Sequence, residues 1–126
     1  MAQFTKQPTD HLPLSVPIFQ ILLTLCREAM HGYAILADIR ARTDTAVELG
    51  AGTLYAAIKR MLMADMVAEC DPPAHVEGED SRRKFYEITA YGREVATAEA
   101  VRLQRLTALA QDRDLIPHLT PAQKKS

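Results

Sequence analysis

The sequence contains no tryptophan, only two cysteines and few glycines, and its formal net charge is −1. Without a strong positive charge the chain has no global field that attracts nucleic acid, so any DNA contact must come from a local cluster of cations. Cys26 and Cys70 stand in no paired motif. This favours two small buried side chains over a metal site or a redox pair, which remain the less favoured interpretations.

Long apolar runs and catalytic motifs are also missing. The longest apolar run, Val16 to Cys26, is far shorter than the ~20 residues that a membrane span needs. The N-terminus "MAQFTKQPTDH" is polar and unlike a secretory signal, so we expect a cytoplasmic protein. No HExxH, P-loop or GxSxG motif occurs, and the histidines are scattered. We therefore expect neither an enzyme nor a bound metal or other cofactor.

Three helices are predicted in the first half of the chain. Ser15 and Pro17 suit the start of a helix that is apolar on nearly every side and is therefore buried from more than one direction. "YAILADIRART" is predicted as the second helix. In "GAGTLYAAIKRML", residues 50–62, one stripe of a 3.6-residue period predicts the third helix, with these apolar members: Leu54, Ile58, Met61 and Leu62.

The second half predicts a hairpin and a long helix. "VAEC" and "RRKFYEIT" alternate as strands do, and the loop "DPPAHVEGEDS" joins them. Thr89 suits the cap of a helix from Ala90 to about Asp112. The predicted fold is mainly α with a small β-hairpin, a winged helix-turn-helix plus a long C-terminal dimerisation helix. We expect a flexible arm over residues 1–12, the DNA-binding domain over 13–89, the dimerisation helix over 90–116 and a flexible tail over 117–126.

The polar side of the third helix is the first candidate DNA contact. In a winged helix this element enters the major groove. The cations Lys59 and Arg60 suit phosphates or guanine edges, and Thr53 and Tyr55 offer hydroxyls. Taken alone, such a helix is more often a solvent-exposed amphipathic helix; the predicted topology around it favours DNA binding.

The second hairpin strand begins with "RRK", Arg82 to Lys84, at the predicted base of the wing. Cations here would add affinity for phosphates without sequence preference. The wing also carries Glu77, Glu79 and Asp80, which repel phosphates. We therefore expect contact from the base of the hairpin, with its tip turned away from DNA.

The final helix carries an apolar seam that also includes Ala100, and its length suggests pairing with a second copy. Together with the very apolar first helix it predicts a homodimer interface that contains Ile18, Leu22, Ala96, Leu103, Leu106 and Ala110.

Three segments, "HGYAI", "GTLYAAIKRML" and "RRKFYEITAYGR", resemble the PadR family of bacterial transcriptional regulators over roughly residues 14–109. The resemblance implies a homodimeric winged-helix regulator, usually a repressor, of the compact branch with a single C-terminal helix. Its DNA contacts would fall on Tyr33, Thr53, Tyr55, Lys59, Arg60, Arg83 and Lys84. The sequence departs from the family at Gly50, at Asp65, which we expect to tolerate a left-handed turn, and at the acidic wing tip.

The resemblance also implies a small aromatic or hydrophobic effector, which some compact members hold at the dimer interface with the help of tryptophan. In this tryptophan-free chain the candidate wall residues are Phe19, Leu23, Val95, Ala96 and Leu103, for which filling of the dimer core is the simpler role.

The leading hypothesis is a repressor that reads a pseudo-palindromic double-stranded operator through the third helix. The alternative is a winged-helix protein-interaction module without sequence-specific DNA binding, which the near-neutral charge and the acidic wing tip favour.

Overall fold

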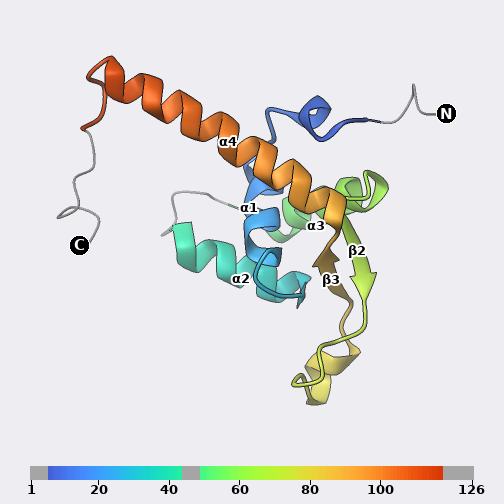
Figure 1. The fold of residues 1–126 in the computed structure, drawn as a ribbon. Coiled ribbons are helices and arrows are strands. Elements are labelled where there is room, and N and C mark those ends of the chain that lie inside the picture. Colours follow the sequence, from blue (N-terminus) through green and yellow to red (C-terminus); the bar gives the residue numbers. More distant parts are fainter. Residues whose placement is uncertain (1–5, 44–48, 118–126) are drawn as a thin grey trace.

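The computed structural model describes residues 6–43 and 49–117 (Figure 1). It confirms the predicted fold class, because helices dominate and the strands form one small antiparallel sheet. The elements in chain order are η2 (Pro8–His11), α1 (Val16–Leu25), β1 (Met30–His31), α2 (Gly32–Thr43), α3 (Ala51–Met63), β2 (Val67–Cys70), η3 (Gly78–Arg82), β3 (Phe85–Ile88) and α4 (Ala90–Asp112), where η marks a short 3₁₀ helix.

Helix α1 is the centre of the domain. Its N-terminus is capped as the sequence predicts, with the Ser15 hydroxyl accepting a hydrogen bond from the Ile18 N–H and Pro17 in the first turn. Helices α2, α3 and α4 and strand β3 all contact α1. The prediction of a helix buried from several sides is thus confirmed. One consequence is that Leu22, expected at a dimer interface, is fully buried inside the single chain and has no surface left for a partner.

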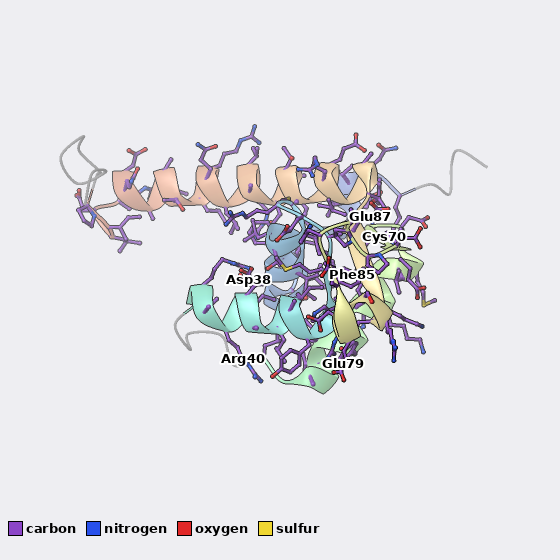
Figure 2. The ribbon with its side chains drawn as sticks, turned by 90° about the horizontal axis from the view of Figure 1, so that it is seen from below. Asp38, Arg40, Cys70, Glu79, Phe85 and Glu87 are labelled. Atoms are coloured by element: carbon purple, nitrogen blue, oxygen red, sulfur yellow. The ribbon has the colours of Figure 1, made fainter. Side chains whose placement is uncertain are left out.

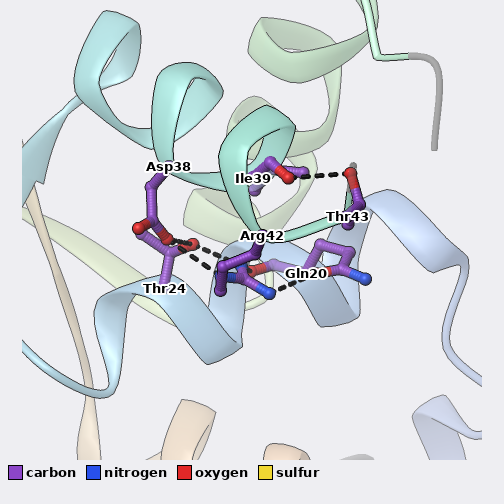
Figure 3. Close-up of polar contacts among 6 residues, drawn as sticks. All are labelled: Gln20, Thr24, Asp38, Ile39, Arg42 and Thr43. Atoms are coloured by element: carbon purple, nitrogen blue, oxygen red, sulfur yellow. Dashed lines mark hydrogen bonds and ion pairs between the residues drawn. The ribbon is translucent and has the colours of Figure 1, made fainter. Parts of the chain in front are cut away.

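A polar network fixes α2 against α1 (Figure 3). The Thr24 hydroxyl donates a hydrogen bond to Asp38 Oδ2 at 2.7 Å. Arg42 donates to the same carboxylate at 3.0 Å, to the Thr24 hydroxyl at 2.7 Å and to the Gln20 side chain at 2.6 Å. Burial alone would raise the pKa of Asp38, but the hydrogen bonds from Thr24 and Arg42 lower it overall. The carboxylate therefore stays charged and holds the two helices in one orientation.

The sheet has the order β1-β3-β2, with both neighbours of β3 antiparallel. The predicted hairpin is present as β2 and β3, in register Cys70 opposite Phe85. Strand β1 is an addition, because Met30 and His31 pair with Tyr86 and Phe85 just before α2 begins. A two-residue strand is too short for an alternating pattern, so the sequence offered no signal for it.

Left-handed backbone conformations occur at Asp65, Gly78 and Asp114, the last with φ 62° in the turn after α4. Asp65, which ends the turn after α3, has φ 61°, as the sequence comparison with the family predicted. Gly78, with φ 72°, begins the η3 turn at the tip of the hairpin. Figure 1 shows this hairpin projecting away from α4, which gives the domain its wing.

The described part of the N-terminal segment, from residue 6, forms η2 and lies against α4. The Leu14 N–H donates a hydrogen bond to Glu99 at 2.8 Å, and His11 Nε2 lies 2.7 Å from the Tyr91 hydroxyl. Long-range contacts of this kind connect residues about eighty positions apart, so no local sequence pattern reveals them. The expected tail falls almost entirely on residues 118–126, outside the described part of the chain.

Helix α4 begins at the Thr89 cap, where the Thr89 hydroxyl accepts a hydrogen bond from the Gly92 N–H. Its first half packs on the core, with Val95 and Ala96 buried. Its second half extends beyond the rest of the domain (Figure 1) and exposes Leu106 and Leu109 by 51% and 47%. In the described residues no helix has the length and apolar character needed to cross a membrane.

Candidate nucleic-acid interface

One side of α3 is buried and the other faces solvent. The predicted apolar stripe is confirmed for Leu54, Ile58 and Met61, while Leu62 is half-buried and Ala57 joins the buried side. The side chains predicted for DNA contact are all on the exposed side: Thr53, Tyr55, Lys59 and Arg60. The helix thus presents its polar surface to solvent, as a recognition helix does.

Tyr55 joins α3 to the start of α2. Its ring lies directly over Gly32, so closely that a Cβ atom on Gly32 would overlap the Tyr55 hydroxyl and ring. The ring still exposes 47% of its surface. Gly32 is therefore the residue that lets the two helices of the helix-turn-helix meet through an exposed aromatic side chain.

The base of the wing completes this side of the molecule. A hollow of about 240 Å³ lies between β1, α3 and β3 and is lined by His31, Gly32, Tyr55, Arg83, Lys84 and Tyr86. The guanidinium of Arg83 lies 5.8 Å from the centre of the Tyr33 ring, in the range of a cation–π contact. Four of the predicted contact residues are thus brought together around one hollow or its rim: Tyr33, Tyr55, Arg83 and Lys84.

Both wing cations have carboxylate partners within the chain. Arg83 Nε lies 3.1 Å from Asp80 Oδ1, and Lys84 Nζ lies 3.6 Å from Glu69 Oε1. Arg82, the third cation of "RRK", ends the η3 turn. The sequence identified these cations and the acidic wing tip, but it did not show that they pair.

His31 also lines the hollow at the base of the wing. Its Nδ1 accepts a hydrogen bond from the Ala34 N–H at 3.1 Å, so the histidine caps α2, and the neutral ring carries its proton on Nε2. Nε2 lies 3.8 Å from Asp80 Oδ1, and the ring packs edge-on against Phe85. Burial lowers the pKa of His31, with Asp80 acting in the opposite direction and Arg83 adding to the decrease.

The N-terminus of α3 is open. Gly50 occupies the cap position, and among the described residues no side chain caps the first turn. A Cβ atom built on Gly50 or Gly52 meets no atom of the described residues within 4 Å. Packing within the described residues therefore does not require these glycines. The backbone N–H groups and the dipole at a helix N-terminus attract anions.

Arg60 lies apart from the hollow at the wing. It borders a second hollow, of about 580 Å³, between the N-terminal segment, the end of α3 and the start of α4, which is lined by Lys6, His11, Arg60, Met63, Ala64, Asp65 and Tyr91. Thr53 and Lys59 are exposed on α3. The predicted contacts on α3 therefore all lie on its exposed side, with Tyr55 beside the wing hollow and Arg60 beside the hollow toward α4.

The residues predicted for an effector site differ in exposure. Val95 and Ala96 are buried in the core of the single chain, Phe19 is half-buried, and Leu23 and Leu103 expose 39% and 37% of their surfaces. No group of three or more His, Cys, Asp or Glu side chains suited to a metal ion occurs within residues 6–43 and 49–117.

The transcriptional regulator PadR-like family matches residues 21–98, which spans the helix-turn-helix, the wing and the first half of α4. The chain belongs to the PadR-like family. The sequence-based resemblance is thereby confirmed, and the family consists of transcription regulators, not enzymes. No curated protein matches the chain.

Solved structures of this PadR-like fold support the same architecture. A PadR family transcription regulator from Clostridium difficile R20291 is 20% identical, with 78% of this chain and 97% of that chain covered and a TM-score of 0.65. A PadR-like transcriptional regulator from Bacillus cereus is 19% identical, with 82% and 94% covered and a TM-score of 0.65. A transcriptional regulator from Clostridium thermocellum is 24% identical, with 76% and 87% covered and a TM-score of 0.62. At these identities the likeness shows the winged-helix fold.

Proposed function

We propose that this PadR-like protein is a homodimeric repressor that reads a pseudo-palindromic operator through α3. The main support for the proposal is that Arg83 lies near both Tyr55 and Tyr33 beside the exposed side of α3. Tyr55 on α3 and Tyr33 on α2 each offer an aromatic hydroxyl, and Arg83 on the wing offers a positive charge. Together these groups could bind a base edge and the phosphates on either side of it.

The exposed half of α4 supports the dimer. Leu103, Leu106 and Leu109 are exposed by 37%, 51% and 47%, and Ala110 lies beside them half-buried. These positions follow Val95 and Glu99 at helical spacing, so the stripe that faces the core continues past the end of the domain. A second copy would cover it and would place two α3 helices on one face, as a two-fold operator requires.

A small hydrophobic effector fits the same proposal if it binds between α1 and α4 at the dimer interface. Three of the predicted wall residues are at least partly exposed and could contact it: Phe19, Leu23 and Leu103. Such a ligand would favour one separation of the two α3 helices over another and so shift the dimer between DNA-binding and released states.

The alternative is a winged-helix module that docks on another protein without reading DNA. The pairing of both wing cations with carboxylates favours it, because paired cations attract phosphate less. A repressor needs base contacts in addition to phosphate contacts, so sequence preference separates the two functions.

The test is a binding titration of the purified protein at several salt concentrations. The probes are a duplex from the region upstream of its own gene and a random duplex of equal length. The repressor should prefer the upstream duplex and lose affinity steeply as salt increases. Equal affinity for both duplexes at every salt concentration would contradict sequence-specific repression and support the interaction module.

A further inference from the structure

We propose that Asp80 and Glu69 are specificity-determining residues that neutralise the wing cations and so suppress sequence-independent DNA binding. The proposal rests on the proposed function, because it concerns how the same wing and α3 discriminate between DNA sequences.

The charges of the wing are paired one to one. Asp80 Oδ1 lies 3.1 Å from Arg83 Nε, and Glu69 on β2 reaches across the sheet to Lys84, with Oε1 3.6 Å from Nζ. All four side chains keep about half of their surface or more in solvent. The cations are thus available to DNA, but each lies beside an anion that a phosphate must displace.

Asp80 lies near two side chains, Arg83 and His31. It belongs to the η3 turn, and its Oδ1 lies 3.8 Å from His31 Nε2 as well as near Arg83. Because His31 Nδ1 accepts a hydrogen bond from the Ala34 N–H, the neutral ring carries its hydrogen on Nε2, the ring nitrogen that faces Asp80. Of the acidic residues of the wing tip, Asp80 thus lies beside the base of the wing.

The physical effect follows from counterion release. A free cation that binds a phosphate releases a counterion from the DNA, which supplies most of non-specific affinity. A cation already paired with Asp80 or Glu69 exchanges one anion for another, so its net gain is small. Base contacts from α3 are unaffected by this exchange. The paired wing therefore lowers affinity for random DNA more than affinity for the operator.

The net charge of the chain makes this effect large in relative terms. With a formal charge of −1 there is no excess of cations to bind DNA non-specifically. Releasing even one wing cation per protomer would add a substantial part of the electrostatic attraction available.

The decisive variants are Asp80→Asn and Glu69→Gln, with Glu79→Gln and Glu87→Gln as matched controls. Each control removes one negative charge from the η3 turn or from strand β3, but neither Glu79 nor Glu87 forms an ion pair within the described residues. In Figure 2, Glu79 lies on the wing side away from α4, and Glu87 lies on β3 close to α4. The comparison separates loss of a pair from a change in total charge.

The measurement is the affinity of each full-length variant for a random duplex and for the upstream duplex across a salt series. Asp80→Asn should bind the random duplex about three- to fivefold more tightly than wild type, the scale of an exposed ion pair. Its plot of log affinity against log salt should steepen by about 0.9 for each phosphate gained. The upstream duplex should gain less, so the ratio of the two affinities should fall.

Three results would overturn the inference. The first is that Asp80→Asn and Glu69→Gln match their controls, which would make total charge the only factor. The second is that Asp80→Asn weakens binding of both duplexes, which would make Asp80 an orienting partner of Arg83. The third is that the gain in Asp80→Asn persists when Arg83→Ala is added. A wild-type protein that binds neither duplex would instead overturn the proposed function, and the inference with it.

Discussion

The ring of Tyr55 on α3 lies directly over the backbone of Gly32 at the first position of α2. The space that a side chain at position 32 would occupy is filled by the Tyr55 ring. Tyr33 follows immediately and contacts Arg83 of the wing through its ring. The absence of one side chain at position 32 therefore sets the position of the aromatic residue that we expect to meet DNA.

The substitution Gly32→Ala tests this relationship. The new methyl group would displace the Tyr55 ring, which is half-exposed and can rotate into solvent. Alanine is also a better helix former than glycine, so stability should change by less than about 1 kcal/mol. DNA affinity should fall by about 1–3 kcal/mol, as for loss of a base contact. Urea unfolding and operator binding measure the two effects.

Gly92→Ala is the matched control for that substitution. Its methyl group would overlap the carbonyl group of Met66, which belongs to the backbone and cannot rotate away. This variant should lose about 1–3 kcal/mol of stability, as overpacked sites do. Normal operator affinity in a folded Gly32→Ala variant would show that the position of Tyr55 does not matter for DNA.

Substitutions of Tyr55 and Arg60, both on the exposed side of α3, should affect the salt dependence of operator binding differently. Tyr55→Ala and Arg60→Ala should each weaken operator binding by about 1–3 kcal/mol if the side chain reads a base. Arg60 carries a charge, so its loss should also reduce the slope of affinity against salt, while loss of Tyr55 should leave that slope unchanged.

Met63→Ala provides the comparison on the same helix, because Met63 is 80% exposed and offers no strong hydrogen bond. It should bind the operator as wild type does. If Arg60→Ala binds the operator as tightly as Met63→Ala does, then Arg60 lines the hollow near Tyr91 without contacting DNA.

Local patterns predicted the elements, and long-range contacts explain what the patterns missed. The stripe that includes Leu54 and Ile58 and the Ser15 cap are properties of short segments, and both are present in the structure. Strand β3 is also present, but its burial does not alternate, because the neighbours Phe85 and Tyr86 are both buried. The pairing of Glu69 with Lys84 depends on strand register, and that of Leu14 with Glu99 joins distant segments. Periodicity carries no information on such contacts.

The same distinction explains the assignments on α1 and α4. An apolar helix can be buried by its own domain or by a partner, and the sequence pattern is the same in both cases. In the structure Leu22, Val95 and Ala96 are buried in the core of the single chain, and Leu106 is exposed on its surface. Only the arrangement of all helices around α1 separates these cases.

A charge in the exposed stripe of α4 should prevent dimer formation. Leu106→Glu would place a carboxylate at the centre of the proposed interface, where an unpaired charge cannot be desolvated. The protomer should remain folded, since Leu106 is 51% exposed. Sedimentation should therefore show monomers with an unchanged circular dichroism spectrum.

Gln104→Glu is the control, because it adds the same charge to α4 at a position half a turn away from the stripe. This variant should sediment as the wild type does. A Leu106→Glu variant that remains a dimer would move the interface away from this part of α4.

Glu99 should make the stability of the protein sensitive to acid. Its side chain is only 2% exposed, and it accepts hydrogen bonds from Arg102 and from the Leu14 N–H. The Arg102 hydrogen bond, opposed by burial and aided by the Leu14 bond, lowers the pKa of Glu99 below its ordinary value of 4.5. A lowered pKa in the folded state means that the carboxylate stabilises the fold above pH 4.5, and that this contribution disappears as the pH falls through the lowered value.

Glu99→Gln should therefore be less stable than wild type near neutral pH, by about 1.5–3 kcal/mol for a lost charge-assisted hydrogen bond. The difference should vanish in acid, where the wild-type side chain is protonated and also neutral. Urea unfolding of both proteins across the acidic range measures this, with Glu94→Gln as the control because Glu94 is an exposed carboxylate on the same helix. Since other carboxylates such as Asp38 titrate in the same range, the informative quantity is the difference between wild type and variant. A difference that stays constant with pH would mean that shape at position 99, and not charge, holds the N-terminal segment to α4.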